Sequence, residues 1–201
     1  MSAPLFTDDV KFLQRMLCAA GCYSGPADGL STPTVDAAET RLEEISNRIA
    51  SAHGTFDPRS ERNIRSLHPK AQEAARKHLQ ALRNAGLDAR IISGTRTYAE
   101  QDALFQIGRA AGDVRKHVTN AEAGRSNHNF GIAWDIGIFE NGKYLTDEAP
   151  YRKAATFRPS GVEWGGDWKS FSDPPHYQLA VGKKLAEVRE CFESGKPYVN
   201  V

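Results

Sequence analysis

The chain has 201 residues, a formal net charge of +1, 40% hydrophobic residues and 25% charged residues. A chain of this size and composition can bury one globular domain and a small additional one. The balanced charge, without a Lys/Arg-rich block, gives no basis for a nucleic-acid partner. No apolar run approaches the roughly 20 residues that a membrane-spanning helix needs, so we expect no membrane insertion.

The N-terminal sequence from Met1 to Asp9 has neither a basic flank nor an apolar core, so we expect no Sec-type signal peptide. The protein is therefore expected to stay in the cytoplasm in which it is made, unless another pathway releases it. The three cysteines, Cys18, Cys22 and Cys191, are odd in number and include no CxxC pair. This disfavours a disulfide framework or a zinc ribbon, and we expect small buried apolar side chains.

Two helices are predicted in the first 54 residues. Val10, Leu13 and Leu17 recur at helical spacing, and a second apolar stripe runs through residues 32–52. Residues 21–29 between them are rich in Gly and Pro, which predicts a turn.

Composition divides the chain into three parts. Residues 1–54 are predicted to form the small helical module. Residues 55–66 are polar and contain Pro58, which predicts a linker. Residues 67–201 then form the main domain.

The main domain begins with a predicted helix, strand and second helix. Residues 69–84 carry an apolar stripe that includes His78, which we interpret as a packed histidine. Residues 87–93 have a short strand pattern. A helix over residues 99–108 follows, with Thr97 as its cap and Glu100 completing a capping box.

Loops and further helices complete the pattern. Arg96 lies on the turn after the strand, a common place for functional side chains, although a surface arginine would look the same. Residues 109–125 lack periodicity and predict a long loop, and such loops are usually functional or mobile. Asn141 and Gly142 predict a hairpin turn, and residues 150–160 and 181–193 predict helices.

One stretch, residues 126–139, places His128 and Asp135 in an otherwise apolar, β-prone run. A buried carboxylate is costly unless something pairs with it, and a metal ion with an upstream imidazole would do so. A surface aspartate on a half-buried strand, with the histidine in the preceding loop, explains the same residues. This stretch alone does not separate the two interpretations.

Three motifs distinguish between a metal site and a surface aspartate. Residues 126–135 fit Ser-x-His-x-x-Gly-x-Ala-x-Asp, residues 173–176 fit Asp/Glu-x-x-His, and residues 93–101 fit Ser-Gly-x-Arg-Ser/Thr…Gln. In this order they resemble the zinc peptidases that include D-Ala-D-Ala carboxypeptidases and L-alanyl-D-glutamate endopeptidases. Residues 161–168 look most like the endopeptidase branch, which supplies the wall-cutting domain of many phage endolysins. The sequence has no HExxH motif, which excludes the helix-borne zincin arrangement.

The resemblance implies one zinc ion per chain, with His128, Asp135 and His176 as ligands. Two imidazoles and one carboxylate leave a fourth position open for water. Asp173 would then be the general base, and Arg96 would stabilise the oxyanion or hold a substrate carbonyl. Substrate-side roles are expected for four further residues: Gln101, Ser126, Trp164 and Trp168.

Strand parity adds a geometric demand. In a regular strand His128 and Asp135 would face opposite sides, so the chain must bend near Gly131 for both to meet one ion. Asp135 shares its face with small residues, which leaves room for metal and substrate. The opposite face is expected to be core and carries Phe130, Ile132, Trp134, Ile136 and Ile138.

The resulting prediction is an α+β fold in which a small antiparallel sheet carries a zinc site and is flanked by helices. The function it implies is a zinc-dependent peptidoglycan hydrolase that cleaves a stem-peptide amide, and the choice of the L-Ala–D-Glu bond rests on resemblance alone. A D-Ala-D-Ala carboxypeptidase on the same scaffold and a catalytically silent wall-binding protein are the alternatives.

The N-terminal module resembles a second known family. Residues 10–14 with residues 20–29 resemble a short helical peptidoglycan-binding module, although a helical hairpin that only packs on the main domain is nearly as compatible. The expected partner is bacterial peptidoglycan, and the expected state is a monomer. An endolysin of this kind would wait in the host cytoplasm and reach the wall through a holin-type pore.

Overall fold

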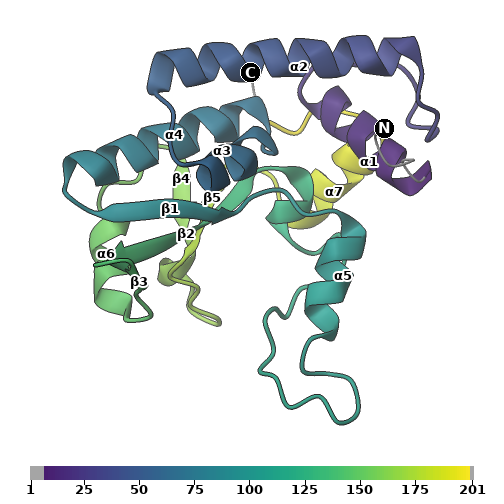
Figure 1. Ribbon diagram of the computed structural model, residues 1–201. Coiled ribbons are helices and arrows are strands. Elements are labelled where there is room, and N and C mark those ends of the chain that lie inside the picture. The colour runs from purple at the N-terminus through teal and green to yellow at the C-terminus, as the bar shows by residue number, and fades with distance from the viewer. Residues whose placement is uncertain (1–6, 200–201) are drawn as a thin grey trace.

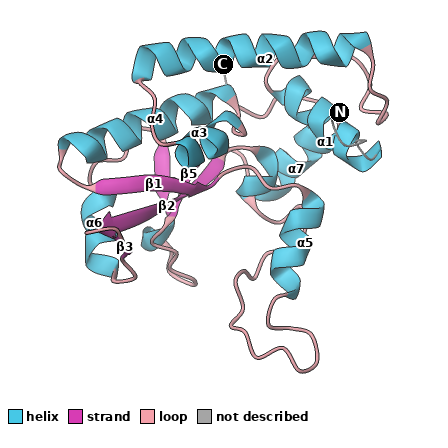
Figure 2. Cartoon of the chain, viewed as in Figure 1, coloured by secondary structure: helices cyan, strands magenta, loops and turns pink. Residues whose placement is uncertain are grey.

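The computed structural model describes residues 7–199 (Figures 1 and 2). The first six residues, on which the expectation of no signal peptide partly rests, lie outside this range. The helices are α1 (Thr7–Ala19), α2 (Pro33–His53), α3 (Pro58–Arg65), α4 (Pro69–Asn84), α5 (Tyr98–Gln106), α6 (Glu148–Ala155) and α7 (Leu185–Glu193). The strands are β1 (Asp88–Ser93), β2 (Ala133–Glu140), β3 (Lys143–Tyr144), β4 (Val162–Trp164) and β5 (His176–Leu179). Among the helices so described, none has the length and apolarity to cross a membrane.

The strands form one antiparallel sheet in the order β1-β2-β5-β4, and β3 pairs with the end of β2. The predicted α+β class with a small antiparallel sheet is confirmed. The two central strands, β2 and β5, come from segments about forty residues apart and pair Asp135 with His176. The sheet therefore joins the two motifs that the sequence separates.

One core lies between α4 and the sheet. The predicted apolar stripe of α4 packs there, and α2 lies across α4 on the side away from the sheet (Figure 1). Trp134, Ile136 and Ile138 point into this core, as strand alternation predicted for β2. Asp135 and Gly137 therefore project from the opposite face, where the site lies.

A second core differs from the prediction. Phe130 and Ile132, expected on the same face as Trp134, instead pack against α1, α7 and the C-terminal segment. They precede β2, and the chain turns between them at Gly131. The ring of Phe130 lies 5.3 Å from that of Phe192 in an edge-on arrangement. The N-terminal helix thus shares a core with the segment that carries His128.

The segment predicted as a linker is instead helical over most of its length, because α3 occupies residues 58–65. Asp57 caps this helix, Pro58 suits its first turn, and Ile64 is fully buried against the sheet. Glu61 of α3 makes a two-pronged ion pair, 2.7 and 2.8 Å, with buried Arg76 of α4. The remaining domain boundaries stay a prediction.

Several local predictions are confirmed. The capping box of Thr97 and Glu100 is present at the start of α5, and α4 has the predicted bounds. Cys18 and Cys22 are buried as predicted, whereas Cys191 is half-buried. Helices α6 and α7 are shorter than predicted, and the sequence did not identify β4 or β5 as strands.

Two buried histidines make stability depend on pH. Burial lowers the pKa of both His68 and His78 to about 4, from an ordinary value of 6.5. The unfolded chain protonates them near 6.5, whereas the folded protein does not until about 4. Their contribution is therefore complete above pH 6.5 and is lost as the pH falls from 6.5 toward 4, at up to about 1.4 kcal/mol per pH unit for each histidine.

His78→Gln tests this. In urea unfolding of zinc-free protein, the wild type is expected to lose about 2 kcal/mol more than the variant between pH values near 7.5 and near 5. Equal losses in the two proteins would show that His78 is not held neutral by burial.

Candidate active site

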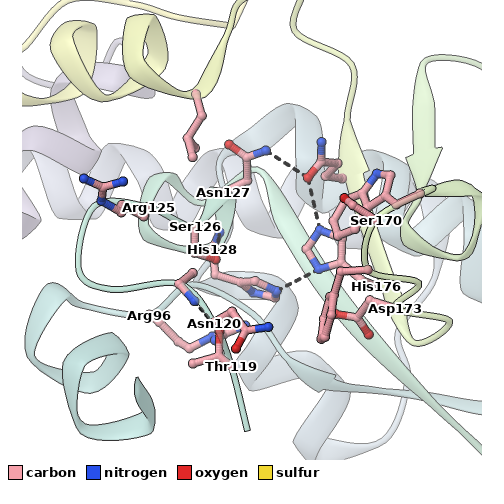
Figure 3. A pocket seen from close by; sticks show the side chains of 15 residues that line it. Arg96, Thr119, Asn120, Arg125, Ser126, Asn127, His128, Ser170, Asp173 and His176 are labelled. Carbon is pink, nitrogen blue, oxygen red and sulfur yellow. Dashed lines mark hydrogen bonds between the residues drawn. The ribbon is translucent and has the colours of Figure 1, made fainter. Parts of the chain in front are cut away.

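Three side chains converge at the centre of the sheet. His128 belongs to the 3-10 helix η1 (Asn127–Phe130), Asp135 lies in β2, and His176 begins β5. Asp135 and His176 are paired across antiparallel strands, so their side chains project from the same face. One ligand-type atom from each of the three lies within 4.8 Å of the others, and Figure 3 shows the imidazoles of His128 and His176 pointing toward one another.

The predicted bend before the strand is confirmed. Gly131 ends η1 in the left-handed region, with φ +65°, and its amide closes the turn onto the carbonyls of Asn127 and His128. This turn brings His128 to the face that carries Asp135. The other side of the site is shaped by a register shift in β1 between Ile91 and Ser93, just before Gly94.

Gly131→Ala is expected to lower the free energy of unfolding by about 2–3 kcal/mol, because alanine is strained at this φ and its Cβ would crowd two neighbours. That Cβ would lie 2.6 Å from the Met16 side chain and 3.1 Å from the backbone nitrogen of His68. Gly142→Ala is the matched control, since Gly142 has φ +76° with nothing within 4 Å of a Cβ. It should cost only about 1 kcal/mol in the same urea unfolding measurement. Equal costs would show that crowding at Gly131 contributes nothing.

Hydrogen bonds fix which imidazole nitrogens face the centre. Nδ1 of His128 donates to the carbonyl of Gly94 at 2.7 Å, so its Nε2 carries a lone pair. Nε2 of His176 lies 3.1 Å from Oε1 of Gln178, which leaves the lone pair on Nδ1. These two nitrogens and Oδ1 of Asp135 are separated by 3.1, 3.2 and 3.2 Å. Three lone-pair donors thus face a single point.

This arrangement fits a metal ion. Three acceptors in such close contact repel one another unless a cation lies between them. Ligands at 2.0–2.1 Å from a tetrahedral zinc ion are roughly 3.3 Å apart, close to the spacing observed here. Two imidazoles and one carboxylate form a donor set typical of catalytic zinc, with one position left for water.

Asp135 is ionised in this setting. Burial opposes its ionisation, yet in the metal-free site His128 and His176, when they carry a proton toward it, hold the pKa of its carboxyl well below the usual range. Its second oxygen lies 3.5 Å from the guanidinium of Arg96. The carboxylate is therefore available as a ligand at neutral pH.

Asp173 lies beside this cluster, on the turn that leads into β5. Its backbone carbonyl accepts from His176 N at 3.0 Å, and the neighbouring carbonyl of Pro174 accepts from the Trp164 indole at 2.7 Å. Burial and then Asp135 raise the pKa of the Asp173 carboxyl, while His176 and Arg96 act in the opposite direction. A carboxyl with a raised pKa, held by a stiff turn next to a metal site, suits proton transfer.

Arg96 lies on the opposite side of the cluster and is largely buried. Its NH1 donates to Gln101 Oε1 at 3.0 Å, and the amide of Gln101 donates to the carbonyl of Ala121 at 2.7 Å. Gln101 is fully buried, so its placement fits support of Arg96 and of the long loop. Among the described residues the Arg96 Nε has no hydrogen-bond partner, although it is buried.

Residues 119–179 match the family model described as D-alanyl-D-alanine carboxypeptidase. Over 127 residues, the chain is 35% identical to the peptidoglycan L-alanyl-D-glutamate endopeptidase CwlK of Bacillus subtilis, covering 56% of this chain and 73% of that enzyme. The chain belongs to this family of zinc peptidases.

Two further relatives of the family were found. A Listeria phage L-alanyl-D-glutamate peptidase is 32% identical over 127 residues, which cover 60% of this chain and 41% of the phage enzyme. The chain thus aligns with less than half of the phage enzyme's length. The chain is also similar to the crystal structure of the Serratia marcescens L-Ala D-Glu endopeptidase ChiX, with 30% sequence identity and a TM-score of 0.47. The aligned region covers 62% of this chain and 88% of the ChiX chain.

The enzymes of this family depend on zinc, and the three converging residues fit that ion. The cleft around them has a volume of about 630 Å³. Of the residues predicted from sequence, it is lined by Arg96, Ser126, His128, Trp168, Asp173 and His176. The individual roles of these residues stay predictions.

Of the four residues with predicted substrate-side roles, Ser126 and Trp168 line the cleft, whereas Gln101 and Trp164 do not. Trp164 is buried behind the cleft, where its indole holds the Pro174 carbonyl, so it does not contact the cavity. Ser126 caps η1 by accepting from His128 N, and its substrate-side role stays a prediction. Trp168 is 37% exposed at the rim, with its ring 4.9 Å from that of His176.

Sequence reasoning missed several cleft residues. Phe171, which is 53% exposed, lines the cleft together with Asn127 and Gln178. Gln178 follows His176 by two positions in a strand, so alternation would have placed both side chains on one face had β5 been recognised. No comparable signal in the sequence indicates Phe171.

Proposed function

We propose that this zinc peptidase is an endopeptidase that cleaves the L-Ala–D-Glu bond in the stem peptide of bacterial peptidoglycan. The observation that carries the proposal is the cluster of His128, Asp135 and His176 beside Asp173, in a chain that covers most of an L-alanyl-D-glutamate endopeptidase. One zinc ion per chain accords with the single converging triad found among the described residues.

The residues of the chain divide the work of amide hydrolysis. Zinc, when bound to the triad, polarises the scissile carbonyl and makes water more acidic. Asp173 accepts the proton of the attacking water and returns it to the leaving amino group. Arg96 donates to the carbonyl oxygen as negative charge develops on it, because its guanidinium stays charged and is held by Gln101.

The biological setting is also a proposal. Similarity to a phage peptidase supports an endolysin that lyses bacteria and is kept in the host cytoplasm until a holin-type pore releases it. We propose a monomer whose only macromolecular partner is peptidoglycan. In this setting α1 and α2 form a wall-binding module or its remnant.

Mass spectrometry of digested muropeptides tests the bond assignment. Purified disaccharide-peptides incubated with the enzyme should release a peptide that begins with D-Glu and leave a muramyl-L-Ala product. The matching family model is described for a carboxypeptidase, so loss of a single terminal D-Ala is the informative opposite result. It would contradict the endopeptidase assignment while leaving the zinc site intact.

A further inference from the structure

We propose that Gln178 and Glu163 form a positioning pair that sets the tautomer of His176, so that its Nδ1 is free to bind the metal. This deepens the proposed function, because it rests on the zinc site of the triad. It does not depend on which amide bond the enzyme cleaves.

The pair is built by strand geometry. His176 and Gln178 are two positions apart in β5, so they share the face that forms the cleft. Glu163 lies in β4 directly opposite Gln178 in the antiparallel register. Its side chain is therefore a lateral neighbour of the glutamine.

The Glu163 carboxylate determines which group donates in each hydrogen bond of the pair. Glu163 can only accept, and its Oε2 lies 2.8 Å from Nε2 of Gln178, so that atom must be the amide nitrogen. The other amide atom, Oε1, is then the oxygen and lies 3.1 Å from Nε2 of His176. An amide oxygen cannot donate, so Nε2 of His176 must carry the proton. The lone pair is thereby assigned to Nδ1, the atom that faces the triad.

A third group reinforces the orientation. The amide nitrogen of Asn127 donates to the same Gln178 oxygen at 2.8 Å. Figure 3 draws this bond and the one to His176 as dashed lines. Asn127 precedes His128 in η1, so the glutamine also links the segments that carry the two imidazole ligands. The amide oxygen of Gln178 accepts two hydrogen bonds and its nitrogen donates one. Rotating the amide by 180° would break all three, so this orientation is favoured.

The two histidines differ in how they are held. His128 donates to a backbone carbonyl, that of Gly94, which no side-chain substitution removes. His176 depends on a side chain, so its tautomer can be changed by mutation. If Nδ1 carried the proton instead, it would have to lose it before binding zinc, and affinity would fall.

Gln178→Met tests the role, because it keeps the length of the side chain and removes the acceptor. We expect zinc affinity, measured by competition with a chromophoric chelator, to fall by about 10–100-fold. In zinc-loaded protein, imidazole ¹⁵N NMR should show a slowly exchanging Nε2–H proton on His176 in the wild type and a faster-exchanging one in the variant, which lacks its acceptor. Gln80→Met is the matched control, since within residues 7–199 the Gln80 side chain hydrogen-bonds only the exposed Asn84 of its own helix.

An exchange variant separates positioning from simple damage. Glu163→Gln combined with Gln178→Glu reverses donor and acceptor within the pair but still presents an oxygen to His176. It should restore the slow exchange of the Nε2–H proton and bring zinc affinity back to near that of the wild type. The proposal is overturned if Gln178→Met binds zinc as tightly as the Gln80→Met control, or if the exchange variant loses as much affinity as the single variant. Neither readout uses peptidoglycan, so both stand even if the bond assignment fails.

Discussion

Replacing Asp173 by asparagine is expected to lower kcat for stem-peptide hydrolysis by about 10²–10⁴-fold, the range that a positioned general base contributes. Asparagine fills the same space and cannot take a proton from water. The zinc content should not change, because Asp173 lies outside the triad whose atoms converge. The measurement is kcat on purified muropeptides, with metal analysis of the same sample.

A control is needed because Asp173 lies on a structured turn. Asp167→Asn is the matched variant, since Asp167 lies in the neighbouring 3-10 helix η2 (Gly165–Asp167), outside the residues that line the cleft. Its kcat should stay within about 2-fold of the wild type. Full activity of Asp173→Asn with stoichiometric zinc would remove Asp173 from the mechanism.

Replacing Asp135 by asparagine is expected to abolish both zinc retention and hydrolysis. The asparagine amide oxygen is a weaker zinc ligand than a carboxylate. All three ligands would then be neutral, so none would offset the charge of the zinc ion. In the wild type, free zinc at 100 times its Kd should raise the free energy of unfolding by about 2.7 kcal/mol. The variant should gain well under 1 kcal/mol under the same conditions.

Urea unfolding with and without zinc measures this difference. The zinc-free variant and the zinc-free wild type should have similar cooperative transitions, which separates metal loss from misfolding. If zinc stabilised Asp135→Asn as strongly as the wild type, the ion would have to bind elsewhere.

The features that the sequence predicted well are those decided locally. The bounds of α4 follow from an apolar stripe and a proline at its start, and the capping box of α5 follows from two residues three positions apart. The core face of β2 follows from alternation. The bend at Gly131 followed from parity combined with the demand that His128 and Asp135 meet.

The features that it missed depend on distant partners. The sequence of helix α3 is mostly polar. The helix is held by its ion pair with Arg76 and by packing on the sheet, and both partners lie outside the segment. Strands β4 and β5 are three and four residues long, too short for a period to be evident. Only pairing with neighbouring strands defines them, β5 with β2 and β4 with β5. Phe130 was assigned to the wrong core because the second cluster is built by α1 and α7 from opposite ends of the chain.

The site shows the same division. The resemblance of three motifs to a known peptidase family predicted the triad, and the structure brings one ligand-type atom of each residue within 4.8 Å of the others. The supporting groups were not predicted, because they reach the site through the tertiary fold: the carbonyl of Gly94 and the side chain of Gln178. Trp164 was predicted to face the substrate, yet nothing in the sequence distinguishes its buried position from the exposed one of Trp168.

Anomalous diffraction from zinc-loaded crystals, recorded on either side of the zinc absorption edge, tests the central claim most directly. We predict one peak per chain, about 2.0–2.2 Å from Nε2 of His128, Oδ1 of Asp135 and Nδ1 of His176. A peak bound to other residues, or no peak among these three atoms at full zinc occupancy in solution, would contradict the account.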